Sequence, residues 1–457
     1  MAKKLLAILA ALCIVAAMGS VGASAVLRPV LVDNAATGEW QLFANETGTG
    51  EFHILVVPDA HQTADADPNL VGYITAAVKY MAVEQSSLDL VIFLGDAISG
   101  TGATAANAAG AIQRLVDPLV AAKIPYTVVF GDADVAGGMT GADLLPLWKA
   151  AGAYTAEYEV DKFEDQVDPA NPSGPKIPVK VGTETKTMAS SLYVEPTLSM
   201  SGGGASLYLV QRDVFEDAKG NETYKKITPH GTLPDTVNTY LRSDPFAQLI
   251  LFDGVQSAAQ VSWFTDTAIK AYPGLAAYVF QHYPLPEVYA GGYFCRTWFN
   301  WALPCAVNVN GIHYFTLPNF AKMVGTVMEN PTLTADAGAY EAFKAASNVQ
   351  AAFFGHNHLN RFTETHGSLR LEQLSGAAWN GGSGCYVVRG GTFVSIRSNG
   401  ASTYYQPDLF SYRQASRVPG STVPDAARDA SDTWKGTTYF FQNLLITMLS
   451  PFRWIFN

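Results

Sequence analysis

Short runs of consecutive apolar residues recur along the chain, and segments with apolar positions at helical spacing separate some of them. The runs, which we predict to be buried strands, cover residues 52–57, 88–94, 126–130, 249–252, 277–281, 313–317 and 351–354. The helical spacing is clearest at Val71, Ile74, Val78 and Met81 and again at Ile112, Leu115, Val116 and Leu119. Alternating strands and helices require crossover connections, so we predict an α/β fold with a largely parallel sheet.

Two stretches depart from this pattern. Residues 161–190 are polar and rich in Pro, Lys and Glu, and we predict a surface insertion there. Residues 398–433 contain Pro407, Pro419 and Pro424 and are predicted to be loop-like.

The last apolar segment is residues 439–456, from Tyr439 to Phe456, and Pro451 and Arg453 interrupt it. It is too short and broken for a typical transmembrane helix. Two interpretations stay open, a helix that packs on the domain and an interfacial helix that makes peripheral membrane contact.

The first residues have the features of a targeting signal. Lys3 and Lys4 precede an apolar run that ends at Met18, and small residues follow at 23–25. We predict a signal peptide over 1–25 and a secreted or extracellular protein; an uncleaved membrane anchor is the alternative. The predicted organisation is then an N-terminal extension at 26–49, one domain at 50–400 that carries the insertion, and a C-terminal extension with the apolar tail at 401–457.

Composition narrows the class of protein. Hydrophobic residues make up 48% of the chain and charged residues 15%, which excludes a disordered chain because enough apolar surface exists for a core. The formal net charge of −11 argues against nucleic acid as a partner. Cys295 and Cys305 are close enough in sequence to bridge a loop in an oxidising compartment, and Cys385 is expected to be a buried thiol.

Aspartate and histidine follow the predicted strands with a regularity that suggests a single site. Ligands of open α/β sheets collect outside the carboxyl ends of the strands. Side chains delivered there from several strands would therefore meet. The candidate residues are Asp59, His61, Asp96, Asp132, His282, His356 and His358.

These residue types indicate metal chemistry. Imidazole and carboxylate without thiolate suit Mn, Fe or Zn. The candidates exceed what one tetrahedral ion needs, so we predict two divalent or trivalent ions roughly 3.5–4 Å apart. A carboxylate such as Asp96 could bridge them.

The motifs and their order resemble the calcineurin-like metallophosphoesterase superfamily, in particular its purple acid phosphatase-related branch. That family has Asp-x-His, Gly-Asp, Gly-Asn-His-Asp/Glu, a single His and Gly-His-x-His. This chain has Asp59-Ala60-His61, Gly95-Asp96, Gly131-Asp132-Ala133-Asp134, His282 and Gly355-His356-Asn357-His358. The resemblance implies a sandwich of two mixed β-sheets flanked by helices, with the metal site at the carboxyl ends of the strands.

The resemblance also implies roles for these residues. Asp59, His61 and His358 would hold the first ion and Asp96 would bridge. Asp132, His282 and His356 would hold the second ion. A metal-bound hydroxide would then hydrolyse a small phosphate ester, with Asp96, His282 and His356 as the catalytic residues.

The chain departs from the family at two adjacent positions. Asp132 replaces an asparagine ligand, which lowers the formal charge of the site from +2 to +1 before hydroxide. Ala133 replaces a histidine that contacts the phosphoryl group, and a missing general acid costs about 10²–10⁴ in rate. Ser99 replaces the tyrosine of the purple enzymes, so no purple charge-transfer band is expected.

Three functions stay open at this point. The first is a secreted dinuclear phosphoesterase of reduced or altered activity. The second is a catalytically silent protein, a pseudoenzyme, that binds metal or a phosphate-bearing ligand. The third keeps only the fold, without metal.

Overall fold

A computed structural model describes the strands that carry the candidate residues and the helices that cover them. For some residues, among them 156–166 and 177–190, it describes the backbone alone. The described residues are 32–34, 39–43, 51–63, 67–84, 88–99, 104–166, 177–216, 222–223, 240–289, 292–296, 306–309, 312–318, 323–326, 332, 334, 336–379, 389–398, 403–424 and 444.

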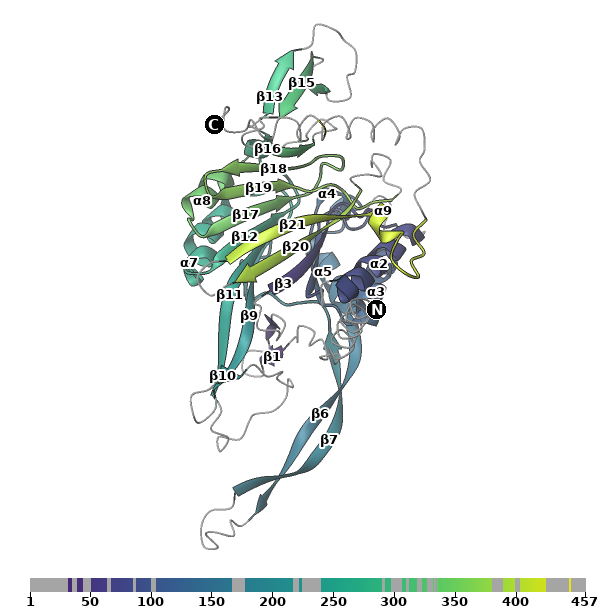
Figure 1. Cartoon of the computed structure of the whole chain (residues 1–457), viewed down its shortest axis with the longest axis vertical. Coiled ribbons are helices and arrows are strands. Elements are labelled where there is room, and N and C mark those ends of the chain that lie inside the picture. The colour runs from purple at the N-terminus through teal and green to yellow at the C-terminus, as the bar shows by residue number, and fades with distance from the viewer. Residues whose placement is uncertain are drawn as a thin grey trace, which may run out of the picture.

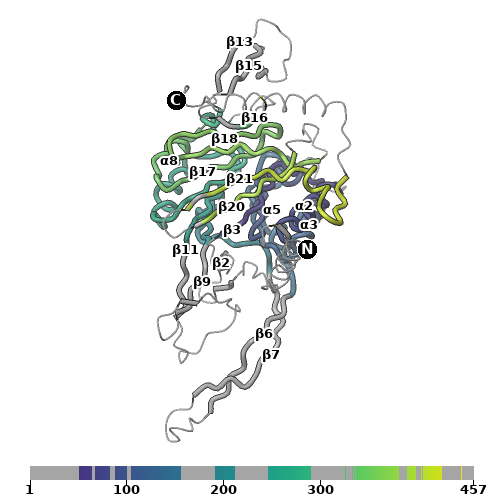
Figure 2. The backbone as a smooth tube through the Cα atoms, in the orientation of Figure 1, coloured from purple at the N-terminus to yellow at the C-terminus, as the bar shows by residue number. Residues whose placement is uncertain are grey.

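One of the two main sheets has five strands, of which Figure 1 labels β3, β20 and β21. Its order is β21-β20-β3-β4-β5, in which β3, β4 and β5 are parallel and β20 and β21 are antiparallel additions. Figure 2 shows β20, near the end of the chain, running beside β3, near its start. The strands are β3 (Glu51–Val57), β4 (Leu90–Leu94), β5 (Tyr126–Val129), β20 (Gly390–Ser398) and β21 (Thr403–Ser411).

The second main sheet is larger. Its core strands β11, β12, β17 and β19 are parallel, and β9 and β18 flank them in the antiparallel sense. Both sheets are therefore mixed, as the resemblance implied. The strands are β1 (Val32–Asn34), β2 (Glu39–Phe43), β8 (Leu198–Ser199), β9 (Ala205–Glu216), β10 (Glu222–Thr223), β11 (Tyr240–Phe252), β12 (Ala276–Gln281), β16 (Met323–Thr326), β17 (Val349–Phe354), β18 (Arg361–His366) and β19 (Leu369–Gln373).

Side-chain alternation explains how the two sheets pack on each other. Tyr278 and Phe353 face the first sheet, where their rings lie 5.5 and 5.6 Å from the ring of Tyr405 in β21. Their neighbours Val279 and Phe354 point the other way, into a second core cluster. Because successive strand side chains alternate between faces, continuous apolar runs are what a sheet buried on both faces requires.

Helices cover the outer face of each sheet. On the first sheet the Tyr80 ring stacks 6.0 Å from Phe393, and Trp148 lies 5.0 Å from Phe93. On the second sheet Phe252 stacks 6.0 Å from Phe343. The helices are α2 (Pro68–Glu84), α3 (Ala105–Ala122), α4 (Asp132–Val135), α5 (Gly141–Ala151), α6 (Ala258–Trp263), α7 (Ile269–Ala271), α8 (Ala339–Ala345) and α9 (Tyr412–Ala415), with a π-helical turn (Phe264–Ala268) and a 3-10 turn (Pro286–Tyr289).

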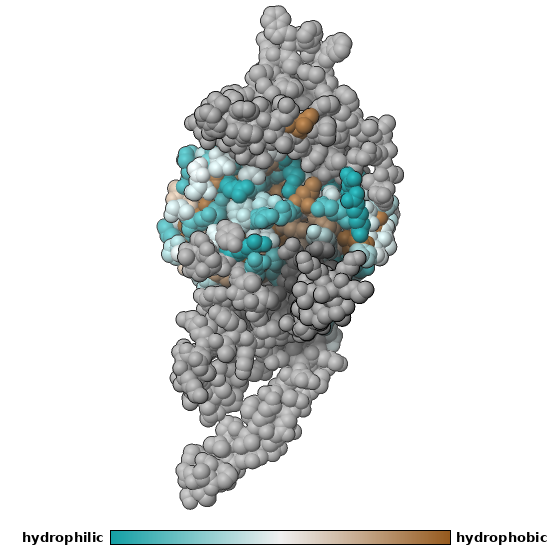
Figure 3. Space-filling model, viewed as in Figure 1, coloured by the Kyte–Doolittle hydropathy of each residue, from teal (hydrophilic) through white to brown (hydrophobic). Residues whose placement is uncertain are grey.

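The described surface is mixed in polarity. Figure 3 shows hydrophilic and hydrophobic residues interspersed over the described part of one face. Among the described residues the exposed large hydrophobics are Val135, Val255 and Leu444. Among the described residues, most large apolar side chains thus lie in the two core clusters.

One sequence prediction about this architecture was wrong. The stretch 398–433 contains β21 and α9 and is not a continuous loop. Pro407 is tolerated because β21 is an edge strand, where a missing N–H breaks no ladder. The predicted strand 313–317 is confirmed as β15 (Ile312–Pro318), which pairs antiparallel with β13 (Gly292–Arg296) and β14 (Ala306–Val309) in a separate sheet.

The predicted surface insertion at 161–190 falls mostly within a hairpin of two long strands, β6 (Ala153–Gln166) and β7 (Ile177–Ser191). The predicted signal peptide, the pairing of Cys295 with Cys305, and the apolar tail apart from Leu444 lie outside the residues whose side chains are described. No helix in the described part of the chain combines the length and apolar character that a membrane crossing requires.

The stability of the fold should depend on pH through Asp253. Burial raises the pKa of its carboxyl to about 6. The Phe130 amide, which donates to this carboxyl at 3.1 Å, acts in the opposite direction because it favours the charged form, but burial has the larger effect. An unfolded aspartate titrates near pH ~4. The folded chain therefore binds more protons between these values, and stability falls as the pH rises through that window.

We expect Asp253→Asn to flatten this fall, because its amide oxygen still accepts from Phe130 and carries no charge. Thermal unfolding between pH 4 and pH 7 measures it, with the exposed Asp266→Asn as the matched control. Identical pH profiles for wild type and Asp253→Asn would contradict the assignment.

Candidate metal centre

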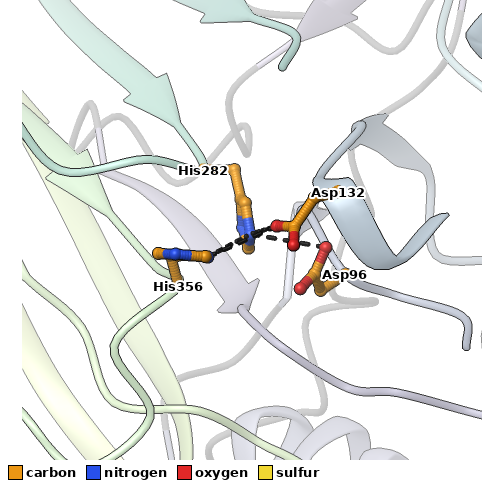
Figure 4. Close-up of side chains that lie close together, drawn as sticks. All are labelled: Asp96, Asp132, His282 and His356. Atoms are coloured by element: carbon orange, nitrogen blue, oxygen red, sulfur yellow. Dashed lines mark hydrogen bonds and ion pairs between the residues drawn. The ribbon is translucent and has the colours of Figure 1, made fainter. Parts of the chain in front are cut away.

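The loops that follow five parallel strands bring all the candidate side chains together. Figure 4 shows Asp96, Asp132, His282 and His356 pointing toward one another from four of these loops. The side chains fall into two groups in which one ligand atom from each residue lies within 4.8 Å of the others. The groups are Asp59, His61 and His358, and Asp96, Asp132, His282 and His356.

The first group joins β3 to the loop after β17. The Nε2 atoms of His61 and His358 are 3.2 Å apart, and the His358 Nε2 lies 3.5 Å from Asp59 Oδ1. Asp59 is fully buried, whereas both histidines are partly exposed. This group is therefore anchored in the core and open on one side.

The second group converges on Asp132 Oδ1. That oxygen lies 3.4 Å from both His282 Nε2 and His356 Nδ1, and those two nitrogens are 3.2 Å apart. His282 is fully buried, but 54% of the Asp132 side chain is exposed. Asp132, at the position where the family motif has an asparagine, thus lies on the solvent side of the group.

Asp96 links the two groups. Its Oδ1 faces the second group, 3.4 Å from His282 Nε2, and its Oδ2 faces the first, 3.7 Å from His61 Nε2. The backbone N–H of Ala133 donates to the same Oδ1 at 2.8 Å and fixes its direction. One carboxylate with one oxygen toward each group is the arrangement that a bridging ligand needs.

The backbone is strained at the ligands. Asp59, His61, Asp96 and His356 have φ of 49°, 46°, 50° and 68°. Left-handed conformations of non-glycine residues cost about 1–3 kcal/mol each and cluster at functional sites. The fold thus maintains four strained residues at this one place.

Hydrogen bonds to the ligands set their orientation. The Nδ1–H of His282 donates to the Leu94 carbonyl at 3.0 Å, which directs Nε2 toward the second group. The backbone N–H of His356 donates to both oxygens of Asp59, at 3.1 and 3.0 Å. These contacts fix the direction of the His282 ring and of the Asp59 carboxylate.

The electrostatics of the site fit bound cations. Burial acts to raise the pKa of Asp59, but His358 and the other histidines hold it below its usual value. Hydrogen bonds from His282 and His356 lower the pKa of Asp132. Carboxylates that stay charged beside imidazoles, with no thiolate, form a donor set that suits Mn, Fe or Zn. The residues therefore fit two metal ions.

Two further residues support the site and were not assigned a role from the sequence. Asp134 accepts from the Gly131 and Ile98 amides at 2.8 and 2.9 Å, so it ties the loop after β5 to the loop after β4. Burial raises its pKa to about 7. An acidic residue three positions after Gly131, in the first turn of α4, is typical of a helix cap, and this spacing could have indicated its role.

Tyr283 is the second. Its ring lies 4.6 Å from His356 and 5.0 Å from His282, and its hydroxyl hydrogen-bonds Asp132. Tyr283 directly follows the candidate ligand His282 in the sequence. Spacing alone could not show that its hydroxyl reaches Asp132.

Other histidines with described side chains lie away from the site. His53 Nδ1 pairs with the Ser395 hydroxyl at 2.9 Å, and His366 with the Tyr340 hydroxyl at 2.8 Å. The side chains of His230 and His313 are outside the described part of the chain. Within that part, no histidine stands in for the one that Ala133 replaces.

The fold, the motif order and the two ligand groups agree with the expectations from the sequence. The chain resembles the calcineurin-like metallophosphoesterases. Each of the two sheets contributes ligands from the carboxyl ends of its parallel strands, and the described groups are the two sets that the resemblance implied.

Comparisons with known proteins give similar folds at low sequence identity. No family model and no curated protein matches the chain. A dimetal phosphatase from Danio rerio is 11% identical with a TM-score of 0.38, over 78% of this chain and 96% of that one. An anchor protein of the Plasmodium inner membrane complex is 10% identical with a TM-score of 0.36, over 86% and 94%.

A 5′-nucleotidase from Candida albicans is 8% identical with a TM-score of 0.33. The match covers 87% of this chain and 58% of the nucleotidase, so this chain spans little more than half of that protein's length.

The close approach at Gly131 predicts that a methyl group there disrupts the centre. A Cβ on Gly131 would lie 2.2 Å from Asp96 Oδ1 and 2.7 Å from the Asp96 backbone nitrogen. We expect Gly131→Ala to cost about 1–3 kcal/mol of stability through overpacking and to weaken Mn²⁺ binding. Gly274→Ala is the matched control, because a Cβ there meets nothing within 4 Å. Equal denaturation midpoints and Mn²⁺ isotherms for the two variants would refute the prediction.

Proposed function

We propose that this protein is a dinuclear metal-dependent phosphoesterase that hydrolyses small phosphate esters. The observation that carries the proposal is the placement of Asp96, with one carboxylate oxygen toward each of two ligand groups. Two ions held about 3.5–4 Å apart form a symmetric clamp for the attacking and leaving oxygens of a phosphoryl transfer. The exposed side of both groups gives a phosphate access to the clamp.

The residues of the two groups have separate roles in this proposal. Asp59, His61 and His358 would hold one ion, Asp132, His282 and His356 the other, and Asp96 both. When bound, the ions would lower the pKa of a water molecule and neutralise charge on the phosphoryl group. The buried anchors Asp59 and His282 keep the ligand set rigid, so that little reorganisation is needed during the reaction.

Two residues support a reduced or altered activity. Asp132 adds a negative charge at the solvent side of the second group, which weakens attraction for an anionic substrate. Ala133 supplies no side-chain donor, and its backbone N–H is engaged by Asp96. Substrates with acidic leaving groups, such as aryl phosphates, depend least on a general acid and should be turned over best.

The second candidate is a catalytically silent protein that binds metal or a phosphate-bearing ligand. The absence of a replacement histidine among the described side chains favours it. In both cases we propose secretion, on the charged and apolar pattern of residues 1–25, and a peripheral membrane contact through residues 439–456.

The proposal is tested by Mn²⁺-dependent hydrolysis of an aryl phosphate by the purified mature chain. We expect activity that Asp96→Asn lowers by at least about 100-fold, since that variant loses a bridging charge. The exposed Asp266→Asn serves as the matched control and should retain full activity. A folded, metal-loaded wild type that is no more active than Asp96→Asn would favour the silent protein.

Restoring a donor at position 133 should raise the rate. We expect Ala133→His to increase kcat, by up to the roughly 10²-fold that a general acid typically contributes at its lower range. The gain should be larger for an alkyl phosphate than for an aryl phosphate, because the alkoxide leaving group needs the proton more. An equal or smaller gain for the alkyl phosphate in steady-state assays would contradict this role.

A further inference from the structure

Tyr283 is held firmly at the mouth of the second ligand group. Its ring packs against His356 in a tilted geometry at 4.6 Å and edge-on against His282 at 5.0 Å. Pro284 and Leu285, the next two residues, are buried and limit movement of the backbone. The ring is thus positioned by the same histidines that would hold the second ion.

The hydroxyl of Tyr283 reaches the solvent-exposed side of the second group. It hydrogen-bonds Asp132, the ligand whose side chain is most exposed among the four of its group. A phenol keeps its proton at neutral pH and can donate a hydrogen bond to an anionic oxygen.

The side chain of residue 133 cannot do this. Ala133 follows Asp132 directly and has only a methyl group, and its N–H already donates to Asp96 Oδ1. A phosphoryl oxygen above the second group would find no donor from position 133. The neutral hydroxyl of Tyr283, on the Asp132 side of the same group, is available to turn from one carboxylate oxygen to a phosphoryl oxygen.

We propose that Tyr283 is a catalytic residue whose hydroxyl donates a hydrogen bond to a non-bridging phosphoryl oxygen of the substrate, in place of the side chain missing at position 133. This inference rests on the proposed function. In the resting state the hydroxyl donates to Asp132, and substrate binding exchanges that acceptor for the phosphoryl oxygen. The donor thereby compensates for part of the charge that Asp132 adds.

Tyr283→Phe tests the proposal because it keeps the ring packing and removes only the hydroxyl. The first readout is the binding of inorganic phosphate to the Mn²⁺-loaded protein by calorimetry. We expect phosphate affinity about 10-fold weaker, as for loss of a hydrogen bond to a charged group, and Mn²⁺ affinity unchanged. With an aryl phosphate, kcat/KM should fall by a similar factor.

Tyr340→Phe is the matched control, since its hydroxyl pairs with His366 away from the site. It should leave phosphate and Mn²⁺ binding unaltered. A Tyr283→Phe variant with weaker Mn²⁺ binding and normal phosphate affinity at metal saturation would overturn the proposal, because the hydroxyl would then act only on Asp132. A wild type that binds Mn²⁺ but no phosphate would overturn the proposed function, and the inference with it.

A double-mutant cycle provides a second test of the shared role. If Tyr283 and residue 133 serve the same phosphoryl group, Tyr283→Phe should cost less in the Ala133→His background than in the wild type. Phosphate affinity gives this comparison even where turnover is slow. Strictly additive effects on phosphate affinity would show that the two positions act independently and would overturn the compensation.

Discussion

The rest of the centre depends on the position of one carboxylate. Asp96 leaves β4 in a left-handed conformation, with φ of 50°, and accepts the Ala133 amide on the oxygen that faces His282. The other oxygen faces His61. Without that division the two ligand groups would be separate clusters. The close fit of Gly131 against Asp96 shows how tightly the loop after β5 packs on this carboxylate.

The sandwich explains why the strain is tolerated. Tyr278, Phe280 and Phe353 pack between the sheets without exposed surface, and this core fixes the strand ends. Burial of large apolar side chains stabilises a fold by roughly 1.5–3 kcal/mol each. A few strained residues at one edge can be supported by such a core. The stability of the packed core thus offsets the backbone strain of the candidate metal-binding residues at the edge of the sheets.

Much of this could be predicted from the sequence because the signals are local. An apolar run followed by Asp or His indicates both a strand and the side chain at its end, so the residues that the structure brings into the two groups could be chosen from the sequence. The strand β21 was missed because Pro407 argues against a strand unless its edge position is known. The left-handed backbone of Asp59 and the return of the Tyr283 hydroxyl to Asp132 depend on tertiary contacts. No spacing in the sequence encodes these features.

We propose that one carboxylate, that of Asp96, joins two cation sites. Electron paramagnetic resonance of the protein loaded with two equivalents of Mn²⁺ tests this most directly, because two ions that share a bridging ligand are magnetically coupled. We expect the spectrum of a coupled Mn²⁺ pair, replaced by that of isolated ions in Asp96→Asn. A wild-type spectrum of isolated Mn²⁺ alone, at full occupancy, would contradict it.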